Sequence, residues 1–241
     1  MTGITDIHTH ILPGVDDGSR SSEQTEELLT ELYRQGVRTV ILTPHYEDGI
    51  YTKTKEELTE CLNQVKAMMK DEIPDLNLYI GNEIYFTDDV PGLLSDGRLC
   101  TLAGSKYVLT EFAVNVNYDI LKNSLYRILL EGFIPVLAHV ERYDCLYKKI
   151  SLVEDLVNMG AYIQVNTESV TKNTPRRIRK FVNKLIDNDL LHIIASDTHD
   201  MKHRKPQFNE CIALLRKKYN DEYIKMLLID NPDKIIHDIY I

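Results

Sequence analysis

The sequence lacks the closely spaced cysteine pairs that mark disulfide frameworks and zinc knuckles. Its four cysteines, Cys61, Cys100, Cys145 and Cys211, lie far apart and form no Cys-x-x-Cys motif. We therefore expect reduced thiols in a cytoplasmic protein. The chain also has no run of 18 apolar residues and no signal-peptide pattern at its N-terminus, so we expect neither membrane insertion nor export.

Several catalytic signatures are missing. There is no Gly-x-Gly-x-x-Gly, no Gly-Lys-Ser/Thr phosphate loop and no Gly-x-Ser-x-Gly nucleophile elbow. Cysteine-based phosphatases carry an arginine six residues after the nucleophile, and the four residues at that offset here are Ala67, Lys106, Ser151 and Lys217. The sequence therefore excludes that mechanism.

Positive charge is scarce. The chain has 28 Lys and Arg against 37 Asp and Glu, which gives a formal charge of −9. This balance argues against nucleic-acid binding through a basic surface. It does not exclude an anionic substrate, because bound divalent cations can reverse the sign of the local potential.

An apolar, strand-like run followed by a helical pattern recurs along the 241 residues. We predict strands at 5–10, 39–45, 76–83, 107–111, 134–139, 162–166 and 192–196, with helices at 21–35, 55–70, 120–131, 152–159 and 175–188. Alternating strands and helices indicate parallel strands with right-handed crossovers. Seven strands in one α/β domain favour a barrel over two open sheets, and 241 residues suffice for its core. Residues 84–106 are the least regular, and we expect loops and short helices there.

Side chains that can bind metals follow these strands at one end. They are His8, His10, His45, Glu83, Glu111, His139, Asp197 and His199. The carboxyl ends of the strands in a β/α barrel meet at one rim, where active sites lie. Taken alone, each residue also has an ordinary structural interpretation, such as a helix cap or a hydrogen-bonded core histidine. Together they predict a metal site, because a buried group of carboxylates without cations would be electrostatically untenable.

The Asp16-Asp17-Gly18 segment follows His10 and has two interpretations. It is either a turn leading to a helix cap, or one aspartate of the pair is a further metal ligand. We assign His192 and His237 structural roles because they do not fit the rim pattern. His203 is close enough to His199 in sequence to contact a substrate.

With these residues, the chain resembles the polymerase-and-histidinol-phosphatase superfamily. It is most similar to the bacterial protein-tyrosine phosphatases encoded with capsule and exopolysaccharide genes. The matching segments are residues 6–18, 43–45, 81–85, 109–112, 138–143 and 195–199, in order along almost the whole chain. The resemblance implies one domain over residues 1–241, folded as a distorted (β/α)7 TIM-like barrel with its metal site at the C-terminal rim of the strands.

The resemblance also implies three divalent metal ions, typically manganese. Mixed imidazole and carboxylate ligands equally suit iron, cobalt or zinc. Three ligand groups are implied, with Glu83 shared between the first two: His8, His10, Glu83 and Asp197; Glu111 and His139 with Glu83; and Asp17, His45 and His199. By resemblance, Arg142 and Arg204 bind the phosphate, and the substrate is the phosphotyrosine-rich tail of a partner capsule tyrosine kinase.

The residue types suit phosphate monoester hydrolysis. Divalent ions lower the pKa of a bound water to about 7 and so supply hydroxide near neutrality. Three of them would turn the charge of the four carboxylates from −4 to a net +2, and arginine grips two phosphate oxygens at once. A tyrosine leaving group, with a pKa of about 10, also needs less help from a general acid than an alkyl alcohol.

Other functions remain open at this level. A small-molecule phosphomonoesterase, such as a histidinol-phosphate phosphatase, would use nearly the same ligands. A phosphodiesterase or nuclease is disfavoured by the acidic charge and by the lack of a basic, aromatic groove. A regulatory module that docks on a kinase without catalysis would show a broken ligand set, and none of the expected ligands is missing here.

Overall fold

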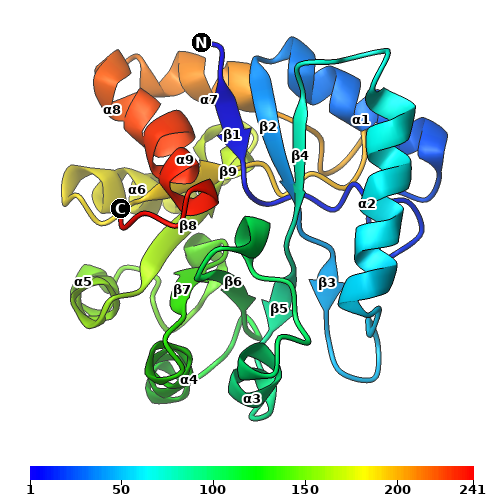
Figure 1. Ribbon diagram of the computed structural model, residues 1–241. Coiled ribbons are helices and arrows are strands. Elements are labelled where there is room, and N and C mark those ends of the chain that lie inside the picture. Colours follow the sequence, from blue (N-terminus) through cyan, green and yellow to red (C-terminus); the bar gives the residue numbers. More distant parts are fainter.

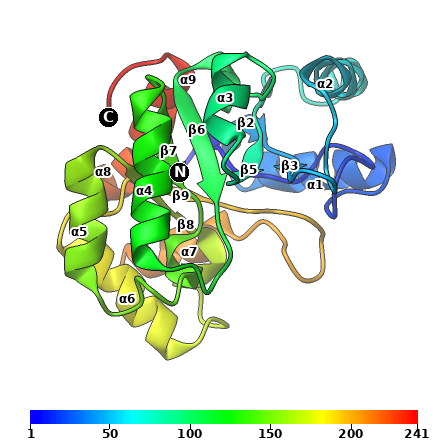
Figure 2. The same ribbon diagram turned by 90° about the horizontal axis from the view of Figure 1, so that it is seen from below.

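The computed structural model describes residues 1–241 as parallel strands with helices packed outside them (Figure 1 and Figure 2). The strands are β1 (Ile4–Asp6), β2 (Val37–Leu42), β3 (His45–Tyr46), β4 (Asn77–Ile80), β5 (Glu83–Tyr85), β6 (Tyr107–Glu111), β7 (Ile134–Leu137), β8 (Tyr162–Asn166) and β9 (Ile193–Ala195). The α-helices are α1 (Ser22–Arg34), α2 (Lys55–Met69), α3 (Val90–Ser95), α4 (Tyr118–Leu130), α5 (Ile150–Met159), α6 (Arg176–Asp187), α7 (Phe208–Leu215), α8 (Asp221–Lys225) and α9 (Asn231–Ile236).

The second and third predicted strands are each broken in two, which corrects the single strands expected at 39–45 and 76–83. One set of strands has the order β1-β2-β4 and the other the order β3-β5-β6-β7-β8-β9, all parallel. Pro44 separates β2 from β3 and has no N–H for a ladder bond. Gly81 separates β4 from β5 where a Cβ would crowd Leu102 at 3.1 Å. The pairing of β2 with β4 is followed by that of β3 with β5 beyond the breaks, so the two sheets continue into one another.

The first and last strands meet to curl the sheet into a barrel. Just beyond β1 and β9, Thr9 and Thr198 form an isolated parallel bridge. The N–H of His10 donates to the carbonyl of Thr198, and the N–H of Asp197 donates to the carbonyl of His8, both at 2.8 Å. At the other end, a π-helical turn, η4 (Met226–Asp230), contacts both β1 and β9. The first and last strands therefore meet directly only beyond their carboxyl ends, and η4 contacts both of them elsewhere. This arrangement fits the expected distorted barrel.

The helices begin and end where local chemistry dictates. The Ser21 hydroxyl accepts from the N–H of Gln24 to cap α1, and Gly36 follows the helix with a φ of +97°. Thr54 and Glu57 form a reciprocal capping box at the start of α2. None of the helices combines the length and the apolarity that a bilayer crossing needs.

Two regions add to the predicted elements. Residues 84–106 contain the end of β5, the short helix α3 and a 3-10 turn, η1 (Leu102–Gly104), in agreement with the short helices expected there. The C-terminal α7, α8, η4 and α9 had no predicted counterpart. Of these elements, η4 contacts β1 and β9 and α9 contacts β1, and the region contributes Phe208, Leu227 and Leu228 to a core cluster of 42 buried apolar residues.

Candidate metal centre

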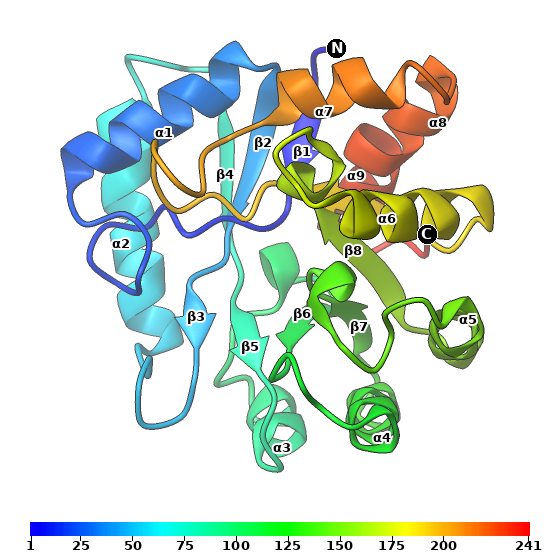
Figure 3. The same ribbon diagram turned by 180° about the vertical axis from the view of Figure 1, so that it is seen from behind.

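All nine side chains expected as metal ligands come together at the carboxyl ends of the strands. Figure 3 looks onto this face, where the loops after the strands lie. His45, Glu83 and Glu111 belong to β3, β5 and β6, while the other six stand on the segments that follow β1, β7 and β9. Strand ends from across the barrel therefore supply one cluster, as the parallel topology predicts.

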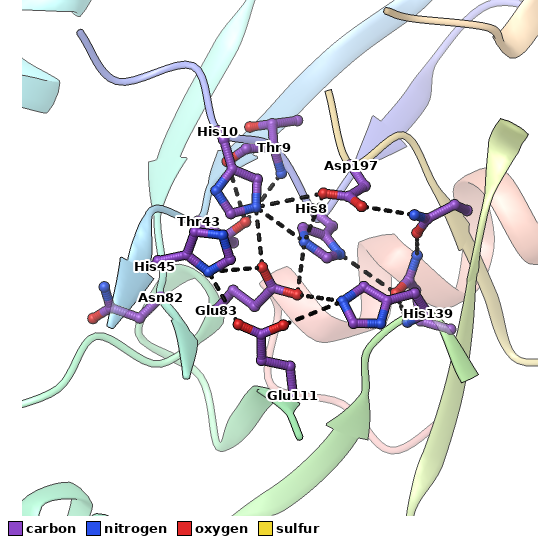
Figure 4. Close-up of polar contacts among 12 residues, drawn as sticks. His8, Thr9, His10, Thr43, His45, Asn82, Glu83, Glu111, His139 and Asp197 are labelled. Carbon is purple, nitrogen blue, oxygen red and sulfur yellow. Dashed lines mark hydrogen bonds and ion pairs between the residues drawn. The ribbon is translucent and has the colours of Figure 1, made fainter. Parts of the chain in front are cut away.

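The floor of the cluster consists of His8, His10, Glu83 and Asp197, each at most 2% exposed. The Nε2 atoms of the two histidines lie 3.2 Å apart. Each also lies 3.1 Å from a different oxygen of Glu83 and within 3.5 Å of Oδ1 of Asp197. Figure 4 shows these side chains turned toward one another around Glu83.

The opposite ring nitrogens of these histidines face acceptors. His8 Nδ1 lies 3.4 Å from Oε1 of Gln164, and His10 Nδ1 lies 2.7 Å from Oδ2 of Asp16. Because an amide or carboxylate oxygen can only accept, Nδ1 carries a proton in both rings, and Nε2 presents a lone pair once the imidazole is neutral, as it must be to bind a cation. Two lone pairs and two carboxylates that converge in this way form a cation-binding donor set.

Glu83 also faces a second group of side chains. Its Oε1 lies 2.8 Å from Nε2 of His139, and its Oε2 lies 3.2 Å from Nδ1 of His45. Glu111 lies 3.1 Å from the same His45 nitrogen and 3.5 Å from Nε2 of His139. The buried Glu83 carboxylate is therefore shared between two groups of donors.

A third group lies nearer the surface and contains His10, Asp17, His45 and His199. Oδ1 of Asp17 lies 3.4 Å from Nε2 of His45 and 3.3 Å from Nε2 of His199. The Asp17 side chain is 49% exposed, whereas the floor is sealed. The cluster therefore opens to solvent at Asp17.

The structure separates the roles of the two neighbouring aspartates. Asp16 orients His10 and also accepts from the backbone N–H groups of Gly18 and His45. Its oxygens are occupied by these contacts, while those of Asp17 face His45 and His199. Gly18 is required here because a Cβ would lie 2.0 Å from the carbonyl oxygen of His10.

The charges of the cluster stabilise one another. Burial raises the pKa of Glu83, but the adjacent His8, His10 and His139 outweigh burial and hold it well below its usual value. Burial likewise opposes ionisation of Asp197, and His8, Arg142 and Arg204 overcome it and lower the pKa. Burial lowers the pKa of His10, yet the Asp16 carboxylate raises it to about 9. Positive charge is thus required among these carboxylates, and divalent cations can supply it in place of protons.

The distances also fit cation binding. Nitrogen and oxygen ligands about 2.0–2.2 Å from a transition ion are separated from one another by roughly 3–3.5 Å. The N···O separations between the candidate ligands of these groups span 2.8–3.5 Å. Three donor groups have ligand atoms within 4.8 Å of one another: His8, His10, Glu83 and Asp197; His10, Asp17, His45 and His199; and His45, Glu83 and Glu111.

Arg142 and Arg204 flank the cluster on the side of Asp197. Nη2 of Arg142 lies 2.8 Å from Oδ2 of Asp197, and Nη2 of Arg204 lies 2.5 Å from Oδ1. The Arg142 and Arg204 side chains are 37% and 30% exposed. Both guanidinium groups therefore stand between the buried donors and solvent, where a bound anion would reach them.

Two of the expected ligands have strained backbones. His139 has a φ of +33° and Asp197 a φ of +55°, and both are non-glycine residues in the left-handed region. Such conformations cost on the order of 1 kcal/mol or more and persist where the surrounding structure enforces them. The chain accepts this strain at the two positions where a strand end must turn its side chain into the cluster.

Sequence reasoning missed the polar residues that support the ligands from β8. Gln164 accepts from the N–H of His139 at 2.7 Å and donates to Asn166, whose side-chain amide donates to Asp197 at 2.7 Å. The available signal was their spacing of two on a buried strand, which points both side chains to the same side. The strand was predicted, but its polar side was not assigned.

The remaining histidines lie apart from the cluster. His192 Nδ1 accepts from the N–H of Ile163 at 3.1 Å, consistent with a structural role. Nδ1 of His237 lies 2.9 Å from the backbone carbonyl oxygen of Asp233 and forms a local hydrogen bond with it. His203 is exposed, and its backbone N–H donates to Asp200.

Comparisons with known proteins give a consistent result. A model of the family described as "Capsular polysaccharide synthesis, CpsB/CapC" matches residues 4–237. The tyrosine-protein phosphatase CpsB of Streptococcus pneumoniae is 38% identical over 97% of this chain and 98% of its own length. The tyrosine-protein phosphatase YwqE of Bacillus subtilis is 32% identical over 97% of this chain and 91% of its own.

Solved structures extend this comparison. One, from work on YwqE of Bacillus subtilis and CpsB of Streptococcus pneumoniae as unique metal-dependent tyrosine phosphatases, superposes with a TM-score of 0.92 at 32% identity and covers 99% of this chain and 96% of its own. A phosphotriesterase homology protein from Escherichia coli aligns over 98% of this chain and 99% of its own with a TM-score of 0.64 at 14% identity. The latter likeness concerns the fold alone.

Proposed function

This chain belongs to the CpsB/CapC family of capsular polysaccharide synthesis, and from that premise we propose that it is a metal-dependent tyrosine phosphatase that hydrolyses phosphotyrosine on a protein. The observation that carries the proposal is the convergence of imidazole lone pairs and carboxylates around Glu83, flanked by two arginines. The tyrosine-protein phosphatases CpsB and YwqE match the chain over nearly its full length.

We assign three divalent ions to the cluster, with manganese as the expected metal and iron, cobalt or zinc as alternatives. The first would be held by His8, His10, Glu83 and Asp197, the second by Glu83, Glu111 and His139, and the third by Asp17, His45 and His199. Both nitrogens of His45 face carboxylates, Nδ1 toward Glu83 and Glu111 and Nε2 toward Asp17. A neutral imidazole binds through one nitrogen, and we assign Nε2 to the third ion.

The protein's own residues would position the phosphate. Arg142 and Arg204 already point their guanidinium groups at Asp197 from the open side of the cluster. Their forks suit a tetrahedral dianion whose oxygens lie between them and the metal ligands. When bound, the divalent ions supply hydroxide near neutral pH and neutralise phosphoryl charge. The phenolate of tyrosine can leave without a dedicated acid, because its conjugate acid has a pKa of about 10.

The partner and setting are part of the same proposal. The substrate would be a phosphotyrosine-bearing protein, namely a bacterial tyrosine kinase of capsule or exopolysaccharide synthesis, and the enzyme would act in the cytoplasm. The whole chain, residues 1–241, would act as one domain, which agrees with candidate ligands drawn from its first, middle and last thirds. Partial exposure of Asp17 and of both arginines supports access for a phosphate attached to a protein.

The test compares two substrates on metal-analysed protein. Turnover of a phosphotyrosyl peptide should exceed that of histidinol phosphate, be abolished by chelator and return on addition of Mn²⁺. Preference for histidinol phosphate would replace the proposal with a small-molecule phosphatase. No turnover of either substrate by metal-loaded protein would leave a kinase-docking module as the better description.

A further inference from the structure

The candidate metal ligands that converge around Glu83 are called the metal cluster below. A basic cavity of about 470 Å³ lies outside it, between the loop after β7 and helix α6. Its cationic side chains are Lys148, Arg176, Arg177, Lys180 and Lys184, and no acidic residue lines it. All five are exposed. Five positive charges around one hollow contrast with the formal charge of −9 on the chain as a whole.

None of these five cations forms an ion pair, although ion pairs are common elsewhere on the surface, as between Arg216 and Asp221. Arg176, Lys180 and Lys184 follow one another at intervals of four along α6 and therefore share one side of the helix. Like charges at this spacing destabilise a helix. A bound anion would relieve that repulsion, so the arrangement favours a ligand over a purely structural role.

The floor of the cavity is aromatic. The rings of Tyr147 and Phe181 meet edge to face with centroids 5.9 Å apart. Lys148 Nζ lies 5.1 Å from the centre of the Tyr147 ring, and Arg177 Cζ lies 5.9 Å from it. Lys148 holds this place with a φ of +62°, in the left-handed region. The cavity therefore offers apolar contact below a ring of positive charge, which suits acidic peptide side chains and their backbone.

The position of the cavity links it to the metal cluster. Tyr147 lies five residues after Arg142, and its N–H donates to the carbonyl of the buried Tyr143. Arg176 begins α6, directly after the loop that follows β8. Both segments belong to the face of the barrel where the strands end (Figure 3), so one extended ligand can contact both sites.

We propose that the basic cavity binds an acidic segment of the protein substrate that flanks the phosphotyrosine. This inference rests on the proposed phosphatase function and deepens it, because it assigns a source of substrate selectivity to residues that do not touch the metal cluster. An anionic membrane surface is the competing ligand. The observations favour a peptide, because the cations surround a hollow with an aromatic floor and share a face with the metal cluster.

The test uses the metal-loaded full chain and the triple variant R176Q/K180Q/K184Q, with K55Q/K66Q/K70Q, on α2 and at its C-cap, as a control that removes the same charge. Each phosphotyrosyl peptide carries one block of six residues, placed either before or after the tyrosine. The block consists of glutamates in one peptide of each pair and of serines in the other. The wild-type protein and the control should show a KM about tenfold lower for a glutamate peptide than for its serine counterpart, with kcat unchanged. The α6 variant should lose this difference, while its turnover of p-nitrophenyl phosphate stays at the wild-type level.

A binding measurement separates this inference from the proposed function. Fluorescence anisotropy of labelled, non-phosphorylated hexaglutamate should report salt-sensitive binding to the wild-type protein and to the control, but not to the α6 variant. This readout holds even if no phosphotyrosyl peptide is hydrolysed, which would refute only the phosphatase assignment. Equal KM values for both peptide types, or equal hexaglutamate binding by all three proteins, would overturn the inference. So would phosphatidylglycerol vesicles that bind through α6 while hexaglutamate does not.

Discussion

The Nδ1 atom of His10 lies 2.7 Å from Oδ2 of Asp16, and this contact fixes which ring nitrogen of His10 faces the metal cluster. His10 has only Nε2 left for a metal, and we assign it to the ion of His8, Glu83 and Asp197, so one carboxylate outside the ligand set controls the geometry of that group. Carboxylates that orient a ligand histidine in this way raise its basicity and restrict its rotation.

Replacement of the two neighbouring aspartates should therefore give different metal losses. Asp16→Ala should weaken metal affinity by about 10–100-fold at the group of His8, His10, Glu83 and Asp197. Asp17→Ala should remove about one ion per chain, since Asp17 belongs to the exposed donor group alone. Elemental analysis after dialysis against graded chelator measures both. Identical metal content in the two variants would contradict the separate roles.

Loss of a buried ligand should abolish catalysis without unfolding the protein. His139→Ala and Asp197→Ala each remove a donor from the cluster, and we expect kcat/KM for a phosphotyrosyl peptide to fall by at least about 10²–10³-fold. Circular dichroism should show unchanged secondary structure. Wild-type turnover in the Asp197→Ala protein would refute the assignment of the active site.

The two flanking arginines should act on phosphate and not on metal. Arg142→Ala and Arg204→Ala each remove charged hydrogen-bond donors, which corresponds to a loss of about 10–100-fold in kcat/KM. Lysine at either position should restore only part of the activity because it lacks the planar fork. Metal content should match the wild-type protein. Unchanged kinetics in both alanine variants would assign the arginines to the surface.

His192 should make the fold sensitive to acid. Burial lowers its pKa to about 4, against about 6.5 in an unfolded chain. The unfolded state therefore binds the proton first as pH falls. The free energy of unfolding drops by up to about 3 kcal/mol between pH 6.5 and 4. His192→Gln keeps an acceptor for the N–H of Ile163 and should flatten this part of the stability curve. Urea denaturation of both proteins at several pH values measures the difference, and parallel curves would contradict it.

The sequence predicted the barrel and the convergence of its candidate metal ligands better than it predicted their supports. The candidates were visible because metal-binding residue types recur at strand ends, and parallel strands bring those ends together whatever their exact bounds. The supporting role of Gln164 could not be predicted, because a glutamine in a strand has no distinctive signal. Its role depends on the contact with His139, which only the fold creates. The breaks at Pro44 and Gly81 depend on contacts between strands, which no local pattern reports.

The C-terminal region was missed for a related reason. Helices α7, α8 and α9 are short, with 8, 5 and 6 residues, and the π-helical turn η4 joins two of them. Segments of this length owe their helical form to packing more than to intrinsic propensity. The contact of η4 with both β1 and β9 follows from the three-dimensional arrangement alone.

The bridge between Thr9 and Thr198 has a consequence for synthesis on the ribosome. The first histidines leave the exit tunnel early, but Asp197, which completes their donor group, is translated almost 190 residues later. At about 5–20 residues per second, the nascent chain therefore spends on the order of ten seconds or more with His8 and His10 lacking that partner. Full metal capture and catalytic competence must then arrive together, late, when the last strand closes against the first.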